Sequence, residues 1–202
     1  MDLGDLEQAK ECHDRALAIR LEKFGPEHVN VASTYNNLAL VHWHLGDLEQ
    51  AKEYHDRARA IRLEKLGPEH VDVASTYNNL GIVHRDLGDL EQAKECHDRA
   101  LAIRLEKLGP EHVDVASTYN NLGIVHRDLG DLEQAKEYYD RARVIYREKV
   151  GPEHVHVTRN LVEVQRMIDN PQSFPAVGRK RRHSAAELGK IPGKIQRVKE
   201  SN

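Results

Sequence analysis

Aromatic side chains are scarce in this sequence, at 5% of its 202 residues, while charged residues reach 31%. This balance favours exposed amphipathic helices over a compact core built from large side chains. No apolar run is long enough to cross a bilayer, and the first residues lack the basic and apolar regions of a secretory signal peptide. We therefore expect a cytoplasmic protein without a membrane partner.

Motifs that carry catalysis are also missing. The sequence has no phosphate-binding glycine loop, no nucleophile elbow and no acid pair set apart from its repeats. Its 13 histidines, above all His84 with His97 and the triplet His42, Trp43 and His44, invite a zinc site. Structural zinc sites need ligands clustered at short intervals, whereas these histidines recur once per 42 residues. We predict that the protein is not an enzyme and uses no cofactor and no metal.

Cysteine is nearly absent, because Cys12 and Cys96 are the only two. They occupy equivalent positions two repeats apart, so four helix layers of roughly 8 to 10 Å each should separate them. A disulfide needs Cα atoms within about 7 Å of each other. We expect both cysteines to be reduced, half-buried packing residues.

What the sequence has instead is an internal repeat. Residues 46–87 and 88–129 differ at only two positions, and Gly-Pro pairs recur in the same register. A Gly-Asp-Leu-Glu-Gln-Ala-Lys-Glu segment opens each unit, at Gly4, Gly46, Gly88 and Gly130. The period is therefore 42 residues, which indicates stacked supersecondary units.

Each unit is predicted to form two helices. The first runs from about Leu48 to Leu66, with Asp47 as its N-cap and Gly67 as its stop. The second runs from about Val73 to Leu87 and ends at Gly88. One histidine per unit follows the Gly-Pro pair and is interpreted as a connector residue: His28, His70, His112 and His154.

Small and large residues alternate on the faces that these helices would share. Ala51 and Gly81 allow close approach, while Tyr77 and Leu80 fill the space beside them. Neither helix can bury its face without neighbours, which is typical of a solenoid.

At these residues the sequence resembles the tetratricopeptide family, in the 42-residue variety typified by kinesin light chain. The residues at the family's small and aliphatic signature positions are Leu80, Gly81, Gly88, Ala93 and Ala100, and Asn78-Asn79-Leu80 repeats the light-chain pattern. The resemblance covers about residues 1–168. It implies an all-α fold, a right-handed superhelical solenoid of antiparallel helix pairs.

Two histidines depart from the family pattern. His84 and His97 stand where the family usually has aromatic rings. We interpret them as partly buried rings, which would lower stability below pH ~6 if they are buried in the neutral form.

The ends of the array break the repeat. The chain starts inside a unit, so its first helix lacks a partner, and a fragment of a longer array or end-to-end self-association would explain this. The residues expected to face water there are Leu6, Ala9, His13 and Ala16. The closing helix, at about residues 155–168, is three residues shorter than its counterpart at its start. Its packing stripe is predicted to be Val157, Leu161, Val164 and Ile168, with Arg159, Glu163 and Arg166 facing outward.

A second stripe, beside the packing stripe of the second helices, is the candidate binding surface. Its positions are Ser33, Asn36, Leu40 and Trp43, then Ser75, Asn78, Ile82 and Arg85, then Ser117, Asn120, Ile124 and Arg127. In the family these positions line the concave surface, and the resemblance implies that the asparagines hydrogen-bond the main chain of an extended peptide. A carboxamide both donates and accepts, so it matches any peptide unit.

Sequence preference would come from the other positions of this stripe. Arg85 and Arg127 can form forked bonds to carboxylates, while the apolar side chains and Trp43 offer an anchor site. We therefore hypothesise an acidic peptide with an aromatic or aliphatic anchor. The competing interpretation is a solvated face, copied with everything else in near-identical repeats.

Residues 169–202 form a basic tail that we expect to be disordered. From Asn170 onward, eight basic residues face two acidic ones, a net charge of +6, so the rest of the chain carries −9 against a total of −3. The basic run Arg179, Lys180, Arg181 and Arg182 fits a nuclear import signal, an anionic contact or solubilising charge. Ser184 follows in the context of a basophilic kinase site, and the tail could dock onto the acidic repeats.

These features lead to one main functional hypothesis. The protein is predicted to be an adaptor or scaffold that binds an extended peptide or partner protein along its concave face. The alternative is a structural spacer or a rod that self-associates through its first helix. Nucleic-acid binding is disfavoured because the repeats are acidic. No heptad coiled coil is present, so attachment to a kinesin motor is not predicted.

Overall fold

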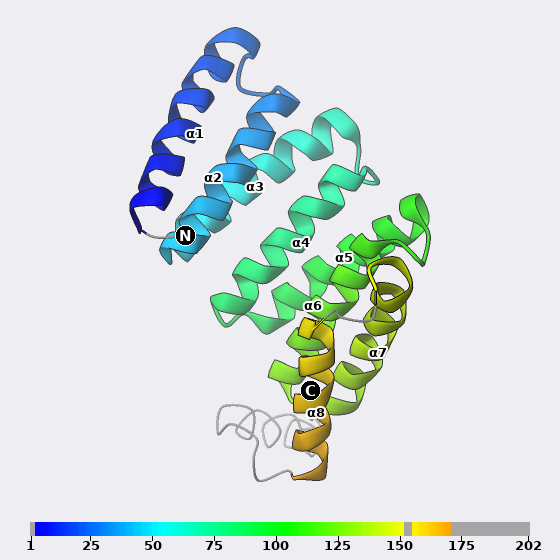
Figure 1. Cartoon of the computed structure of the whole chain (residues 1–202). Coiled ribbons are helices and arrows are strands. Elements are labelled where there is room, and N and C mark those ends of the chain that lie inside the picture. Colours follow the sequence, from blue (N-terminus) through cyan, green and yellow to red (C-terminus); the bar gives the residue numbers. More distant parts are fainter. Residues whose placement is uncertain (1–2, 152–154, 171–202) are drawn as a thin grey trace, which may run out of the picture.

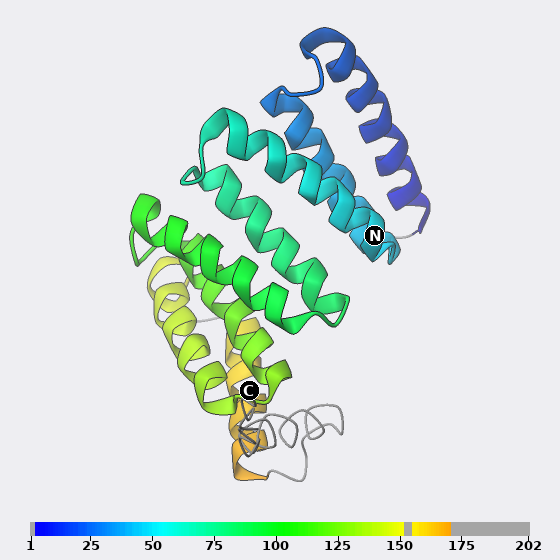
Figure 2. The ribbon, with the colours of Figure 1, turned by 180° about the vertical axis from the view of Figure 1, so that it is seen from behind.

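The computed structural model describes residues 3–151 and 155–170, and within them all regular structure is helical. The helices are α1 (Leu3–Phe24), α2 (Val29–Leu45), α3 (Leu48–Leu66), α4 (Val71–Asp86), α5 (Leu90–Leu108), α6 (Val113–Leu129), α7 (Leu132–Lys149) and α8 (Val155–Asp169). They stack in chain order into one array (Figures 1 and 2). The predicted all-α repeat array is therefore confirmed.

The predicted first helix of the unit is confirmed from Leu48 to Leu66. Asp47 caps it, since its Oδ1 accepts a hydrogen bond from the Gln50 backbone N–H at 3.3 Å. Gly67 follows the last turn with φ +84°, a left-handed conformation that side-chain-bearing residues rarely adopt, so the helix stops there.

The second helix begins at Val71, two residues earlier than predicted, and ends at Asp86. The earlier start arises because His70 is an N-cap and not only a connector. Its Nδ1 accepts a hydrogen bond from the Asp72 backbone N–H at 3.1 Å. His28 and His112 cap α2 and α6 in the same way, while His154 lies outside the described residues.

The closest helix pairs are not those that share a Gly-Pro turn. Each second helix packs more extensively against the first helix that follows it, so the tight pairs are α2/α3, α4/α5 and α6/α7. In two of these pairs a ring sits directly on a glycine. A Cβ added to Gly81 would lie 2.6 Å from His97 Nε2, and one added to Gly123 would lie 2.5 Å from Tyr139 Cε1. The close approach predicted at Gly81 is thus confirmed.

His97 is fully and not partly buried, as is its counterpart His55. Burial lowers the pKa of His97 to about 3 and that of His55 to about 4, and neighbouring arginines add to both shifts. His84 is half-buried, and burial lowers its pKa as well. All three rings are therefore held in the neutral form near neutral pH.

A second contact inside the array was not predicted. Arg104 is buried and donates from Nη1 to Thr118 Oγ1 at 2.7 Å and to the Asp114 carbonyl at 3.0 Å. Arg62 makes the same contacts with Thr76 and Asp72. Burial lowers the pKa of both arginines. These bonds join the end of each first helix to the start of the next second helix.

At the first end, the prediction that Leu6 faces water is wrong, since only 5% of it is exposed. Ala9, His13 and Ala16 are half-buried. The cysteines differ instead of matching, because Cys12 is exposed and Cys96 is buried, and both are free. Among the described helices α1 packs extensively against α2 alone, so Cys12 has no neighbour there equivalent to α4, which shares a core cluster with Cys96.

At the other end, α8 buries Val157, Val164 and Met167, with Leu161 and Ile168 packed beside them. Arg159 and Arg166 are exposed, while Glu163 is half-buried. In the register of the shortened helix, Val162 stands where α6 has Gly123, and it is 65% exposed. A further helix could not bring a ring onto α8 at this position as Tyr139 does on α6.

Candidate functional site

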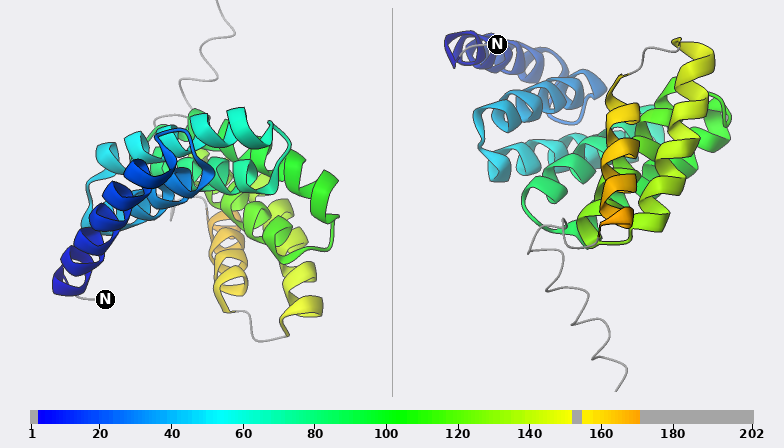
Figure 3. Two further views of the ribbon diagram at one scale, coloured as in Figure 1. Left: turned by 90° about the horizontal axis from the view of Figure 1, so that it is seen from above. Right: turned by 60° about the horizontal axis from the view of Figure 1, so that its bottom comes forward.

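The second helices lie on the inner side of the curved array. α4 contacts α6 and α6 contacts α8, whereas among the described helices no comparable contact joins two first helices. Helices that approach one another more closely lie at the smaller radius of a curved stack. Figure 3 shows the resulting arch, with α8 inside α7. The predicted binding stripe is therefore on helices of the inner side.

Of the twelve predicted groove positions, most are half-buried. Leu40 is the most open at 38% exposed, and Asn78 is buried. Ser33 and Ser75 turn their hydroxyls to the carbonyls of Val29 and Val71. Fewer of the twelve side chains are therefore open to contact with a ligand than predicted.

The asparagines of this stripe form bridges between neighbouring second helices. Asn121 Nδ2 donates to Asn78 Oδ1 at 3.0 Å. Asn79 makes the same bond to Asn36 at 3.1 Å, and Asn160 to Asn120 at 3.0 Å. Each accepting carboxamide uses its Oδ1 in the bridge, which does not involve its Nδ2 group. This set of bridges, here called the asparagine ladder, holds neighbouring second helices together, a role that the sequence analysis missed. The pair of adjacent asparagines in each repeat was the sequence feature that could have indicated it.

The arginines already have carboxylate partners. Arg85 binds the adjacent Asp86 through Nε at 2.9 Å and Nη2 at 2.6 Å. Arg127 binds Asp128 in the same way and lies 3.6 Å from Glu163. A ligand carboxylate would have to share or replace these partners, so the stripe is less cationic than its sequence suggests.

Trp43 takes the place of Arg85 and Arg127 in the first repeat. Its Nε1 donates to Asp86 Oδ2 at 2.7 Å, which fixes the indole between α2 and α4. Leu40, one turn earlier, is exposed. The α2 end of the stripe thus differs from α4 and α6 in having an indole where they have an arginine, while the aliphatic Leu40 has Ile82 and Ile124 as its counterparts.

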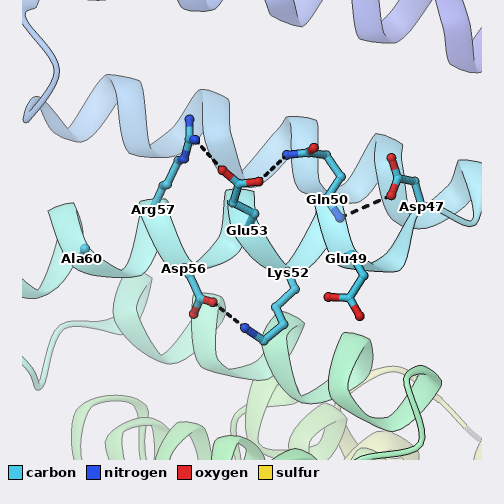
Figure 4. Close-up of a pocket in the computed structure, with 8 residues that line it drawn as sticks. All are labelled: Asp47, Glu49, Gln50, Lys52, Glu53, Asp56, Arg57 and Ala60. Carbon is cyan, nitrogen blue, oxygen red and sulfur yellow. Dashed lines mark hydrogen bonds and ion pairs between the residues drawn. The ribbon is translucent and has the colours of Figure 1, made fainter.

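A pocket lies elsewhere, along α3, and Figure 4 shows its residues from Asp47 to Ala60. Its charged groups are paired with one another: Lys52 with Asp56 at 3.0 Å, and Arg57 with Glu53. None of the twelve predicted positions lines it. A polar, self-paired surface of this kind gives no reason to assign it a ligand.

The described parts of the chain offer no candidate for a metal site or a membrane span, and the predicted features of the tail lie outside them. No three His, Cys, Asp or Glu side chains gather there in a way that could hold a metal ion. No helix among the described residues is long and apolar enough to span a membrane. The tail, with Arg179, Lys180, Arg181, Arg182 and Ser184, lies outside the described residues.

Comparison with known proteins agrees with this geometry. The family model described as tetratricopeptide repeat matches residues 1–64, 30–106, 72–148 and 114–173. The sequence matches no curated protein.

Among solved structures, BtubC (BKLC) from P. vanneervenii is similar with a TM-score of 0.72 and 23% identity, over 98% of this chain and 80% of that one. A candidate kinesin light chain from Podosopora anserina with nearly identical TPR-like repeats has a TM-score of 0.70 at 19% identity, over 93% and 90%. A variant of that protein with one substitution matches at 0.70 and 20%, over 92% and 89%. At these identities the likeness concerns the fold.

Proposed function

Because this chain belongs to the tetratricopeptide repeat family, whose members generally mediate protein–protein interactions, we propose that it is an adaptor for an extended peptide. The peptide segment of a partner protein lies along α2, α4 and α6, and the role of the chain is binding without catalysis. The observation that supports this most is the asparagine ladder. Its bridges fix the spacing of three equivalent carboxamides through their Oδ1 atoms, and a carboxamide Nδ2 group that the bridge does not use can donate to a peptide carbonyl.

The ligand chemistry follows from the asymmetry of the stripe. An aromatic or aliphatic side chain anchors at Leu40 and Trp43, because Trp43 replaces the arginine of the other two repeats and Leu40 is exposed. Acidic side chains of the same segment reach Arg85 and Arg127 and share them with Asp86 and Asp128. The proposal includes a cytoplasmic location, with nuclear entry through the basic run at 179–182 as its alternative.

The test is a pull-down from lysate with the full chain, followed by titration of the captured segment as a synthetic peptide. Asn120→Ala and Asn160→Ala form a matched pair, because both lose the bridge between α6 and α8, and Asn120 is half-buried whereas Asn78 is buried. Only Asn120→Ala also removes a group that would contact the peptide. We expect about tenfold weaker binding for Asn120→Ala, the value of one hydrogen bond to a buried partner, and little change for Asn160→Ala. Equal affinities for the two variants would refute the peptide site.

The alternative function is a spacer or a self-associating rod. It is favoured by one observation, the exposed apolar side chains Leu3 and Ile19 on α1. Sedimentation of the full chain over a wide concentration range separates the two functions. A mass that grows with concentration supports the rod, and a constant monomer mass supports the adaptor.

A further inference from the structure

Two helices of this protein have the same sequence in different surroundings. Residues 4–23, within α1, are identical, position by position, to residues 88–107, which include most of α5 and the two residues before it. α5 packs against α4 on one side and α6 on the other, whereas the one helix against which α1 packs extensively is α2. Figure 1 shows α1 at the edge of the array. The molecule thus contains the same amphipathic helix twice, once packed between two helices, as α5, and once packed extensively against one helix, as α1.

The missing cover leaves an apolar surface, here called the open face, which consists of Ala9, Cys12, His13, Ala16 and Ile19. In α5 the equivalent residues contact α4 or pack in the α4/α5 core. Cys96 is only 5% exposed there, and burial raises the pKa of its thiol to about 11. In α1, Cys12 is exposed and Ile19 is 63% exposed.

The α4/α5 contact defines the chemistry that fits the open face. Tyr77 and Leu80 of α4 share a core cluster with Cys96, and Gly81 gives room for the His97 ring. At the margin, Arg99 donates to the Tyr77 hydroxyl at 3.2 Å. Its counterpart Arg15 has an exposed side chain and only a 3.9 Å contact with Glu11. A complementary helix therefore needs a small residue, glycine as in α4 or alanine as at Ala39 of α2, with a leucine one position before it and a tyrosine four before it.

We propose that the open face is a docking site for one helix of the α4 pattern, carried by a partner protein with repeats of this type. An intact second copy offers no such helix among its described residues. In that copy α2, α4 and α6 already cover α3, α5 and α7, and α8 has Val162 at the glycine position. The site is on a different surface from the proposed peptide groove, so either proposal can fail alone.

The first experiment adds a blocked peptide of residues 71–87 to the full chain and follows thiol labelling by mass spectrometry. Cys96 is the internal reference, because it is the same residue under cover. The labelling rate of Cys12 falls toward that of Cys96 as the peptide saturates the site. A peptide with Gly81→Val gives no protection, since even a Cβ there would lie 2.6 Å from the ring it must accept.

The second experiment removes the cost of forming a helix from a free peptide. Residues 71–87 are fused directly before Gly4, which reproduces the sequence of residues 71–107 across the joint. The expected result is protection of Cys12 at all protein concentrations and a higher Tm, both lost with Gly81→Val in the added segment. Unprotected Cys12 in the fusion overturns the proposal. Protection of the unmodified chain that rises with its own concentration also overturns it, in favour of a second copy.

Discussion

The helices α5 and α7 occupy equivalent places in successive pairs, yet their buried faces differ in chemistry. Cys96, His97 and Arg104 in α5 correspond to Tyr138, Tyr139 and Tyr146 in α7. The partner changes as well, because Thr118, which accepts from Arg104, corresponds to Val157 in the shortened α8. The same backbone arrangement therefore accepts either a cysteine, a histidine and an arginine or three tyrosines.

The comparison shows which feature the fold requires. His97 and Tyr139 both rest on a glycine, and the third pair places His55 at the equivalent position opposite Ala39. A small residue on the second helix, glycine or alanine, is common to all three pairs, while the identity of the ring varies. Ring identity then decides how each pair responds to pH, since histidine titrates in the physiological range and tyrosine does not.

The largest effect on stability is expected from a bulky side chain at the glycine on which the Tyr139 ring rests. Gly123→Val places a branched side chain where even a Cβ would be 2.5 Å from the Tyr139 ring. We expect a loss of about 3 kcal/mol in the free energy of unfolding, measured by urea denaturation. The control is Ala39→Gly, which should cost only about 1 kcal/mol, mainly from helix propensity. An unchanged urea midpoint for Gly123→Val would contradict the close contact.

The next effect is a pH dependence confined to the histidine pairs. The folded pKa values of His55 and His97 lie below the unfolded value of 6.5, at about 4 and about 3. Their contribution is complete above pH 6.5 and is lost as the pH falls toward these values, because the unfolded chain takes up the protons first. At pH 5 each histidine should cost about 2 kcal/mol.

The matched variant for this prediction is His97→Tyr, which gives α5 the ring of α7. The difference in unfolding free energy between pH 7 and pH 5 should shrink by about 2 kcal/mol in this variant. His84→Gln is the control, and it should change this difference less than His97→Tyr does, since His84 is only half-buried. A slope unaltered by His97→Tyr would show that His97 is not held neutral.

A smaller effect on stability is expected at the hydrogen-bonded pair Arg104 and Thr118. Thr118→Val removes the hydroxyl that lies 2.7 Å from the buried Arg104 guanidinium. We expect a cost of about 2 kcal/mol, because the charged donor loses a buried acceptor. Adding Arg104→Tyr copies the α7/α8 chemistry and should recover part of that loss. A double-mutant cycle by urea denaturation measures the coupling, and strictly additive costs would argue against it.

The smallest effect is expected at the helix starts, where α4 and α6 are alike. His112→Ala removes the acceptor of the Asp114 N–H and should cost about 1 kcal/mol, while His112→Asp should keep most of the stability. Thermal unfolding of both variants tests this. If alanine and aspartate behave alike, the cap contributes nothing.

Much of the fold was predictable, because a period fixes which faces are equivalent. The stop at Gly67 and the cap at Asp47 follow from local chemistry, and the close approach at Gly81 follows from a small residue on a face that must pack against the next helix. The burial of Leu6 was not predictable in the same way. It depends on how far α2 reaches over α1, which is a matter of three-dimensional packing.

The sequence was enough to place the candidate stripe on the second helices, but not to predict the hydrogen-bond partners of its side chains. Placing Asn78 and Arg85 on the second helices requires only helical spacing. Their partners, Asn121 and Asp86, were missed because spacing does not show which of two adjacent polar residues turns toward the next helix. Near-identical repeats add no information here, since they copy structural and functional residues equally.

Val162 bears on how an array of this kind can change in length. A duplicated unit inserted between residues 46 and 129 would meet interfaces already present, because residues 46–87 and 88–129 are nearly the same. A unit added after α8 would meet a valine at the position that accommodates a ring in the other pairs. Internal duplication and deletion can therefore vary the number of repeats while the closing helix stays last.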